Sequence, residues 1–68
     1  MKTISGLRMC RLLDARGWEI ARITGSHHIF VKQGCVLRIS VPVHGNQDLK
    51  IGLQKAIMKQ AAIREDEL

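Results

Sequence analysis

The sequence predicts an α+β fold with the element order α-β-β-β-α, in which both helices cover one face of a three-stranded antiparallel sheet. A capped amphipathic segment opens the chain, alternating apolar and polar residues separated by turn residues fill its middle, and a second helical period follows. The chain of 68 residues has room for a single small domain, residues 1–68. With 46% hydrophobic and 25% charged residues, its composition is that of a globular protein.

The first helix is expected from Ser5 to Arg16. Ser5 is a suitable N-cap, because its hydroxyl can accept a hydrogen bond from the first turn. Gly17 supplies the stop, since glycine readily takes the left-handed conformation that ends helices. One side of this helix is apolar and faces the core: Met9, Cys10, Leu12 and Leu13.

The central segment predicts three strands joined by two tight turns. Apolar and polar residues alternate along the first and third strands, the second is β-branched or aromatic in its middle, and glycine marks each turn. In chain order we expect a strand from Trp18, a Thr24-Gly25-Ser26 turn, a strand from His28 to Lys32, a two-residue Gln33-Gly34 loop, and a strand from Cys35 to Val41 that Pro42 ends.

A polar loop, residues 44–47, leads to the second helix, which Asp48 is expected to cap. Gln60 is a polar exception on the apolar side of this helix. The apolar positions of the expected core face are Leu49, Leu53, Ala56, Ile57 and Ile63, and three lysines face outward: Lys50, Lys55 and Lys59.

The turn lengths decide which histidine faces solvent. With a two-residue loop at Gln33-Gly34, Phe30 pairs with Leu37 and His28 with Ile39. The core side then carries Trp18, Ile20, His28, Phe30, Leu37, Ile39 and Val41, and the open side carries His27, Ile29, Val31, Val36, Arg38 and Ser40. His27 is thus accessible with Arg38 diagonal to it, whereas a slip by one residue would expose His28 instead.

The charge is concentrated and positive. Eleven basic and six acidic residues give +5, and three of the acids are among the last four residues, so residues 1–63 carry +7. Such a body favours polyanions, RNA or DNA first, although a solvated basic surface without a ligand has the same composition.

The remaining composition gives expectations on compartment, metals and membranes. Cys10 and Cys35 are interpreted as free, buried thiols of a reducing compartment, and no stretch is apolar enough for a membrane span or a secretory signal, so we expect a cytoplasmic protein. We expect no cofactor and no metal site, because the three histidines would need a fourth ligand and neighbours that point to one side.

Three strings in this sequence resemble the HicA family of bacterial toxins: GSHHIF at residues 25–30, VPVHGN at 41–46 and LKIGLQKAIMKQA at 49–61. The resemblance runs from Ser5 to Ala62. It implies a small RNA-cleaving protein with a double-stranded-RNA-binding-like fold, held inactive by a HicB antitoxin. The chain departs from the family in a shorter second hairpin loop and in Ala62, where a glycine often ends the helix.

The resemblance implies a catalytic role for His27, within the glycine-serine-histidine motif. It places the proline-x-histidine segment at Pro42 and His44, and the lysine-x-glycine start of the second helix at Lys50 and Gly52. With the sheet faces above, the substrate-binding candidates are Gly25, Ser26, Arg38, His44 and Lys50.

The expected function is the toxin of a type II toxin–antitoxin system, a ribosome-independent messenger-RNA endonuclease that uses His27 as general acid or base. The expected partners are mRNA, a HicB-type antitoxin and, weakly, a second copy. Two alternatives stay open: a non-catalytic RNA-binding module of the same fold, and an interaction domain that docks a partner on an apolar patch of Ile29, Val31 and Val36.

Overall fold

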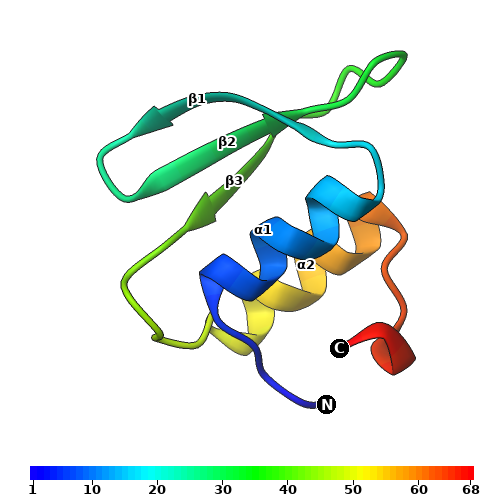
Figure 1. Ribbon diagram of the computed structural model, residues 1–68. Helices are drawn as coiled ribbons and strands as arrows, with labels where there is room; N and C mark the ends of the chain where they lie inside the picture. The colour runs from blue at the N-terminus through cyan, green and yellow to red at the C-terminus, as the bar shows by residue number, and fades with distance from the viewer.

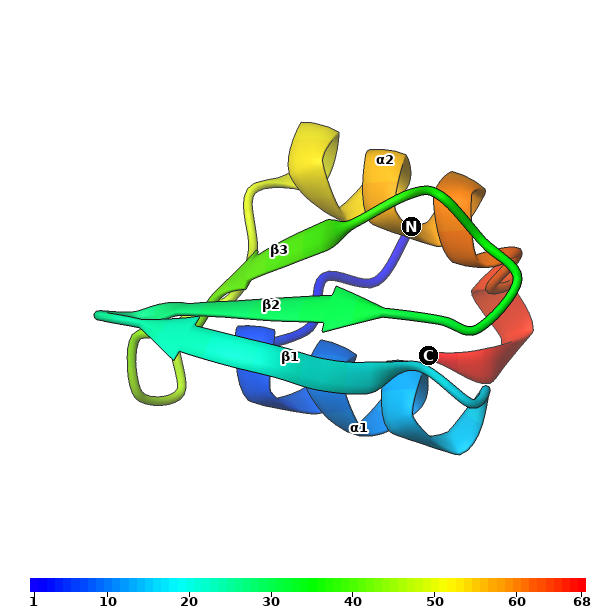
Figure 2. The same cartoon turned by 90° about the horizontal axis from the view of Figure 1, so that it is seen from above.

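The computed structural model describes residues 1–68 and confirms the α-β-β-β-α order (Figure 1). Both helices lie behind the same face of the sheet when the strands are viewed face on (Figure 2), and the sheet is antiparallel with the order β1-β2-β3. None of the helices is long and apolar enough to cross a membrane. The elements are α1 (Gly6–Ala15), β1 (Glu19–Thr24), β2 (His27–Val31), β3 (Ile39–Pro42), α2 (Ile51–Ala61) and a 3₁₀ turn η1 (Glu65–Glu67).

Helix α1 begins as the sequence predicts. The Ser5 hydroxyl accepts a hydrogen bond from the Arg8 backbone N–H at 3.1 Å, which satisfies one of the donors that a helix start leaves unpaired. Gly17 follows the helix with a φ of +86°. The helix buries Met9, Cys10 and Leu13 against the sheet and α2.

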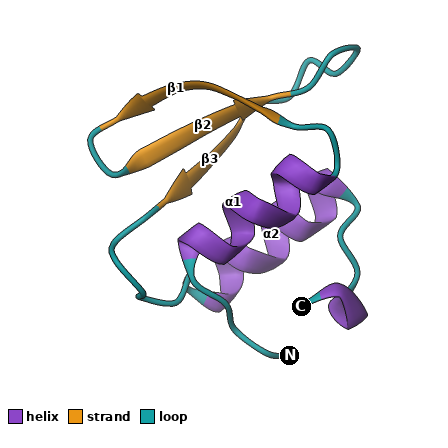
Figure 3. Cartoon of the chain, viewed as in Figure 1, coloured by secondary structure: helices purple, strands orange, loops and turns teal.

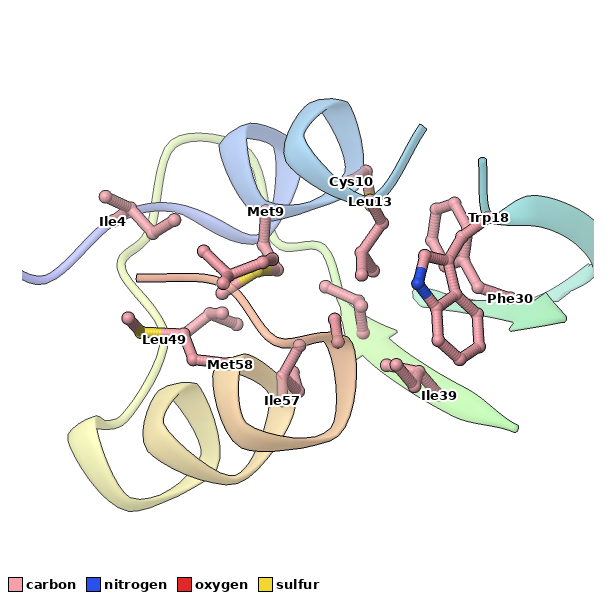
Figure 4. Packing of buried hydrophobic residues seen from close by; sticks show 13 residues of the cluster. Ile4, Met9, Cys10, Leu13, Trp18, Phe30, Ile39, Leu49, Ile57 and Met58 are labelled. Carbon is pink, nitrogen blue, oxygen red and sulfur yellow. The ribbon is translucent and has the colours of Figure 1, made fainter. Parts of the chain in front are cut away.

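The core lies between the sheet and the two helices and contains thirteen buried hydrophobic residues (Figure 4). Trp18 and Phe30 lie side by side at its sheet end, both almost fully buried. Ile39 and Val41 complete the core side of β3, as predicted. The prediction was wrong for two other residues: Ile20 is 50% exposed and Leu37 is 43% exposed.

The hairpin between β2 and β3 is wider than expected (Figure 3). Phe30 pairs with Ile39, two residues beyond the predicted partner Leu37, and no strand forms between Lys32 and Arg38. Gln33-Gly34 does form a turn, closed by the Cys35 N–H to Lys32 carbonyl bond at 3.0 Å. Only Gly34 has a positive φ, +81°, so the turn lacks the two positive φ values of a type I′ hairpin. Turns of types I and II splay the flanking strands, and the ladder therefore resumes only at Ile39.

The first hairpin has a compensating irregularity. Thr24 pairs with His27 across a two-residue Gly25-Ser26 loop, so the turn is one residue shorter than predicted. Gly25 has a φ of +58°, in keeping with a type II′ turn. A bulge at Ala21 then shifts the register back, and Ile20 pairs with Phe30.

Helix α2 differs from the prediction in its cap and in its buried face. Asp48 does not cap it: its Oδ2 accepts from the Thr3 hydroxyl at 2.8 Å, and Lys50 holds the N-cap position without a side-chain bond. The buried positions are Gln54, Ile57, Met58 and Ala61, whereas Leu53 and Ala56 are exposed. Gln54 is fully buried because its amide serves the N-terminal segment, accepting from the Ile4 N–H at 2.9 Å and donating to the Lys2 carbonyl at 2.7 Å.

Ala62 ends α2 in the left-handed conformation, with a φ of 55°. The Ile63 N–H bonds the Met58 carbonyl at 2.9 Å and the Ala62 N–H points to the Lys59 carbonyl, which is a Schellman motif. Because a Cβ disfavours this conformation, alanine here costs about 1 kcal/mol relative to the glycine that often stands at this position. The sequence difference at Ala62 therefore leaves the helix end in place at some cost in stability.

Candidate functional site

The predicted exposure of the histidines is confirmed although the predicted register is wrong. Side chains alternate between faces with a period of two, so a shift of two residues between β2 and β3 leaves the paired side chains of these two strands on their predicted faces. His27 is exposed on the open face of the sheet. His28 is half-buried on the core side, where it pairs with the buried Val41.

The structure brings the first two motifs together. His27 begins β2 and pairs with Pro42, the last residue of β3. Just beyond this pair, the Val43 N–H donates to the Ser26 carbonyl at 2.7 Å, which ties the Gly25-Ser26 turn to the segment that leads to His44. In an antiparallel pair the two Cα atoms lie about 5 Å apart. His27 and the Gly25-Ser26 turn before it therefore lie next to the start of the loop 43–50.

A cavity of about 270 Å³ lies where this loop meets the start of α2. Pro42 forms one wall, so the cavity adjoins the strand position opposite His27. It contains two of the predicted substrate-binding residues, His44 and Lys50, both exposed. Four further lining residues were missed from the sequence: Gln47, Asp48, Leu49 and Leu53. Three of them lie between His44 and Lys50 in the sequence. Their position between two predicted site residues could have identified them.

The other three candidates lie outside the cavity lining: Gly25, Ser26 and Arg38. Gly25 lies in the exposed turn beside Ser26, at the same end of the sheet as His27. Arg38 precedes Ile39, so it lies at the opposite end of β3 from Pro42, roughly 13 Å away along an extended chain. The expected diagonal contact of Arg38 with His27 is therefore wrong, because the ladder register moved Arg38 two residues further along.

His28 lies against Cys10, with 3.9 Å between its Nδ1 and the thiol sulfur. Burial raises the pKa of the Cys10 thiol, so this cysteine stays protonated and acts as a small apolar group of α1. Cys35 is also a free thiol, as predicted, but it is half-buried in the loop after β2 and not in a strand. No three side chains among His, Cys, Asp and Glu lie close enough together to hold a metal ion.

The open face of the sheet carries a smaller apolar patch than predicted. Ile29 and Val31 of β2 are half-buried there. Val36 is 99% exposed, but it lies in the loop outside the sheet, so it does not extend the patch. The three lysines of the second-helix segment are exposed, as expected: Lys50, Lys55 and Lys59.

A basic surface, an α-β-β-β-α fold with both helices on one sheet face, and an exposed histidine beside a loop cavity together define a small protein of the double-stranded-RNA-binding-domain architecture. Comparison with protein-family models agrees: the model described as the HicA toxin of bacterial toxin–antitoxin systems matches residues 7–63. The chain therefore belongs to the HicA toxin family, and its role is that of a toxin in such a system. A search of curated proteins found no match.

Proposed function

We propose that this toxin is a metal-independent endoribonuclease that cleaves messenger RNA without the ribosome and that His27 is its general acid or base. The observation that carries the proposal is the placement of His27 on the open sheet face opposite Pro42, beside a cavity that contains His44 and Lys50. Imidazole takes up and releases protons near neutral pH, which suits this role. The membership in a toxin family adds support.

RNA carries its own nucleophile, so the chemistry needs few protein groups. His27 removes the proton of a 2′-hydroxyl, the 2′-oxygen attacks the adjacent phosphorus, and the bond from phosphorus to the 5′-oxygen breaks. The leaving oxygen takes a proton, for which His44 is the candidate donor. Lys50 stabilises the charge that develops on the phosphoryl oxygens. The products are a 2′,3′-cyclic phosphate and a 5′-hydroxyl.

The test is incubation of the purified chain with a short single-stranded RNA, without ribosomes and with a chelator present. We expect cleavage with a 2′,3′-cyclic phosphate end, and no cleavage where a single 2′-deoxy nucleotide replaces the one at the cut site. RNA binding without any cleavage would instead support the non-catalytic RNA-binding module. Cleavage of the deoxy-substituted strand would exclude attack by the 2′-hydroxyl.

We further propose that a HicB-type antitoxin docks on the open sheet face and inhibits by covering His27. Ile29 and Val31 give this face its apolar patch, and His27 precedes them on the same strand. An antitoxin that is apolar at this patch and acidic around it would compete with RNA, so inhibition would need no change in the toxin's own fold.

Replacement of Val31 by Asp should weaken antitoxin binding more than tenfold, because a carboxylate buried without a partner costs several kcal/mol. Val36→Asp is the matched control: it makes the same chemical change at a residue outside the sheet and should leave the affinity unchanged. Titration calorimetry with the purified antitoxin measures both, and thermal unfolding checks that Val31→Asp is folded. Equal affinity of the two variants would place the antitoxin on another surface.

A further inference from the structure

The cavity beside the His27–Pro42 pair has the size of a site for one small ring system. Its volume of about 270 Å³ lies just below the range of sites for drug-sized ligands, which begins at about 300 Å³. A single nucleobase fits that space. The cavity lies between the end of β3, the loop 43–50 and the first turn of α2, and its lining residues are Pro42, His44, Gln47, Asp48, Leu49, Lys50 and Leu53.

The charges around this cavity are mixed, and that argues against a site for phosphate alone. Lys50 supplies a positive charge, but Asp48 contributes a carboxylate to the same lining. A carboxylate repels a phosphate group at short range. A nucleotide can satisfy both residues, since its phosphate is anionic and its base is neutral and carries hydrogen-bond donors. We therefore assign the phosphate to the Lys50 side and the base to the Asp48 side.

Asp48 is anchored at its backbone and at one carboxylate oxygen. Its Oδ2 accepts from the Thr3 hydroxyl at 2.8 Å, its backbone forms a β-bridge with Ser5, and the next N–H, of Leu49, donates to the Ile4 carbonyl at 2.8 Å. The other oxygen, Oδ1, makes no hydrogen bond within the chain. An ionised carboxylate can only accept, so its partner on a ligand must be a donor.

Only some bases present such a donor edge. Adenine, cytosine and guanine have an exocyclic amino group, and acidic side chains accept from the amino group of cytosine in known readout. Uracil presents two carbonyl oxygens around a single N–H, and a carboxylate repels both of them. Beside Asp48, the apolar side chains of Pro42, Leu49 and Leu53 can cover the face of a base.

We infer that this cavity binds one unpaired nucleobase with an exocyclic amino group, in the nucleotide next to the phosphodiester bond that is broken. The inference rests on the proposed function. The inference adds a substrate preference to the proposed function. The site requires a base whose pairing edge is free, so it requires single-stranded RNA, and it disfavours uracil at that position.

The test uses 5′-labelled trinucleotides of 2′-O-methyl RNA, which have no free 2′-hydroxyl and cannot be cleaved by the proposed chemistry. Fluorescence anisotropy should show the adenine and cytosine trimers binding at least about fivefold more tightly than the uracil trimer. Asp48→Asn keeps an oxygen for the Thr3 hydroxyl but replaces the other with an amide donor, so it should abolish or reverse this preference. Glu19→Gln removes one carboxylate on β1, away from the cavity, and should leave the preference unchanged.

A second measurement needs no variant. In amide NMR titrations of the wild-type chain, cytidine monophosphate should shift residues 47–50 and 53 more than uridine monophosphate does. Equal preference in the wild type and Asp48→Asn, or shifts centred away from the cavity, would overturn the inference. The inference would also be overturned if Asp48→Asn changed the affinity for the antitoxin but left the affinity for every trinucleotide unchanged. The cavity would then serve a protein partner. Because the trinucleotides resist cleavage, an inactive chain would refute the proposed function without altering this result.

Discussion

Replacing His27 with alanine is expected to lower RNA cleavage by about 10²- to 10⁴-fold, the usual contribution of a general acid or base. Growth inhibition on expression should disappear with it. The thermal stability should change little, about 0.5 kcal/mol or less, because the side chain is exposed and makes no hydrogen bond within the fold. Cleavage rates on a labelled RNA, together with thermal unfolding, measure the two effects separately.

The neighbouring histidine is the natural control. His28 is half-buried beneath α1, with its ring against the Cys10 thiol and its strand partner Val41 fully buried. His28→Ala should therefore be the more destabilising variant and should retain more cleavage activity at temperatures where it is folded. The opposite pattern, a stable inactive His28→Ala and an active His27→Ala, would transfer the catalytic role to His28.

This contrast between adjacent histidines could be predicted from the sequence because it depends only on parity. The alternation of apolar and polar residues along 35–41 identifies the core side of β3, and antiparallel pairing extends it to β2; Phe30, Ile39 and Val41 lie there as expected. The same pattern cannot distinguish registers that differ by two residues. The actual register depends on the backbone of Gln33, which does not take the positive φ of a tight hairpin turn, and this misplaced Arg38 relative to His27.

The position of Asp48 in the cavity lining could not be predicted, because a contact with a distant segment of the chain holds it there. Asp48 was expected to cap α2, which is a local rule. It instead bonds Thr3, and Gln54 turns inward to bond Ile4 and Lys2, so the N-terminal segment determines both positions. Hydrophobic periodicity ranks a glutamine as a surface residue, and this shifted the predicted buried face of α2.

Substitution of Gly6 by alanine is expected to destabilise the fold by about 2 kcal/mol, since overpacking commonly costs 1–3 kcal/mol. For a domain of this size that corresponds to a fall of roughly 10 °C in Tm. The first turn of α1 lies directly on the end of β3, and Gly6 is buried there. A Cβ on Gly6 would overlap the Pro42 carbonyl oxygen and lie 3.2 Å from the Val43 Cα. These are backbone atoms, so relief requires the helix or the strand end to move.

Gly52→Ala is the matched control, because a Cβ there meets no atom within 4 Å and its φ is not in the left-handed region. In the first turn of α2 that change should leave stability unchanged or raise it by up to about 1 kcal/mol. We expect the two variants to differ in function as well as in stability. Movement at Pro42 and Val43 would disturb the pair with His27 and the bond to Ser26, so folded Gly6→Ala should also cleave RNA more slowly than the wild type. Equal melting temperatures for the two variants would show that α1 does not approach β3 this closely.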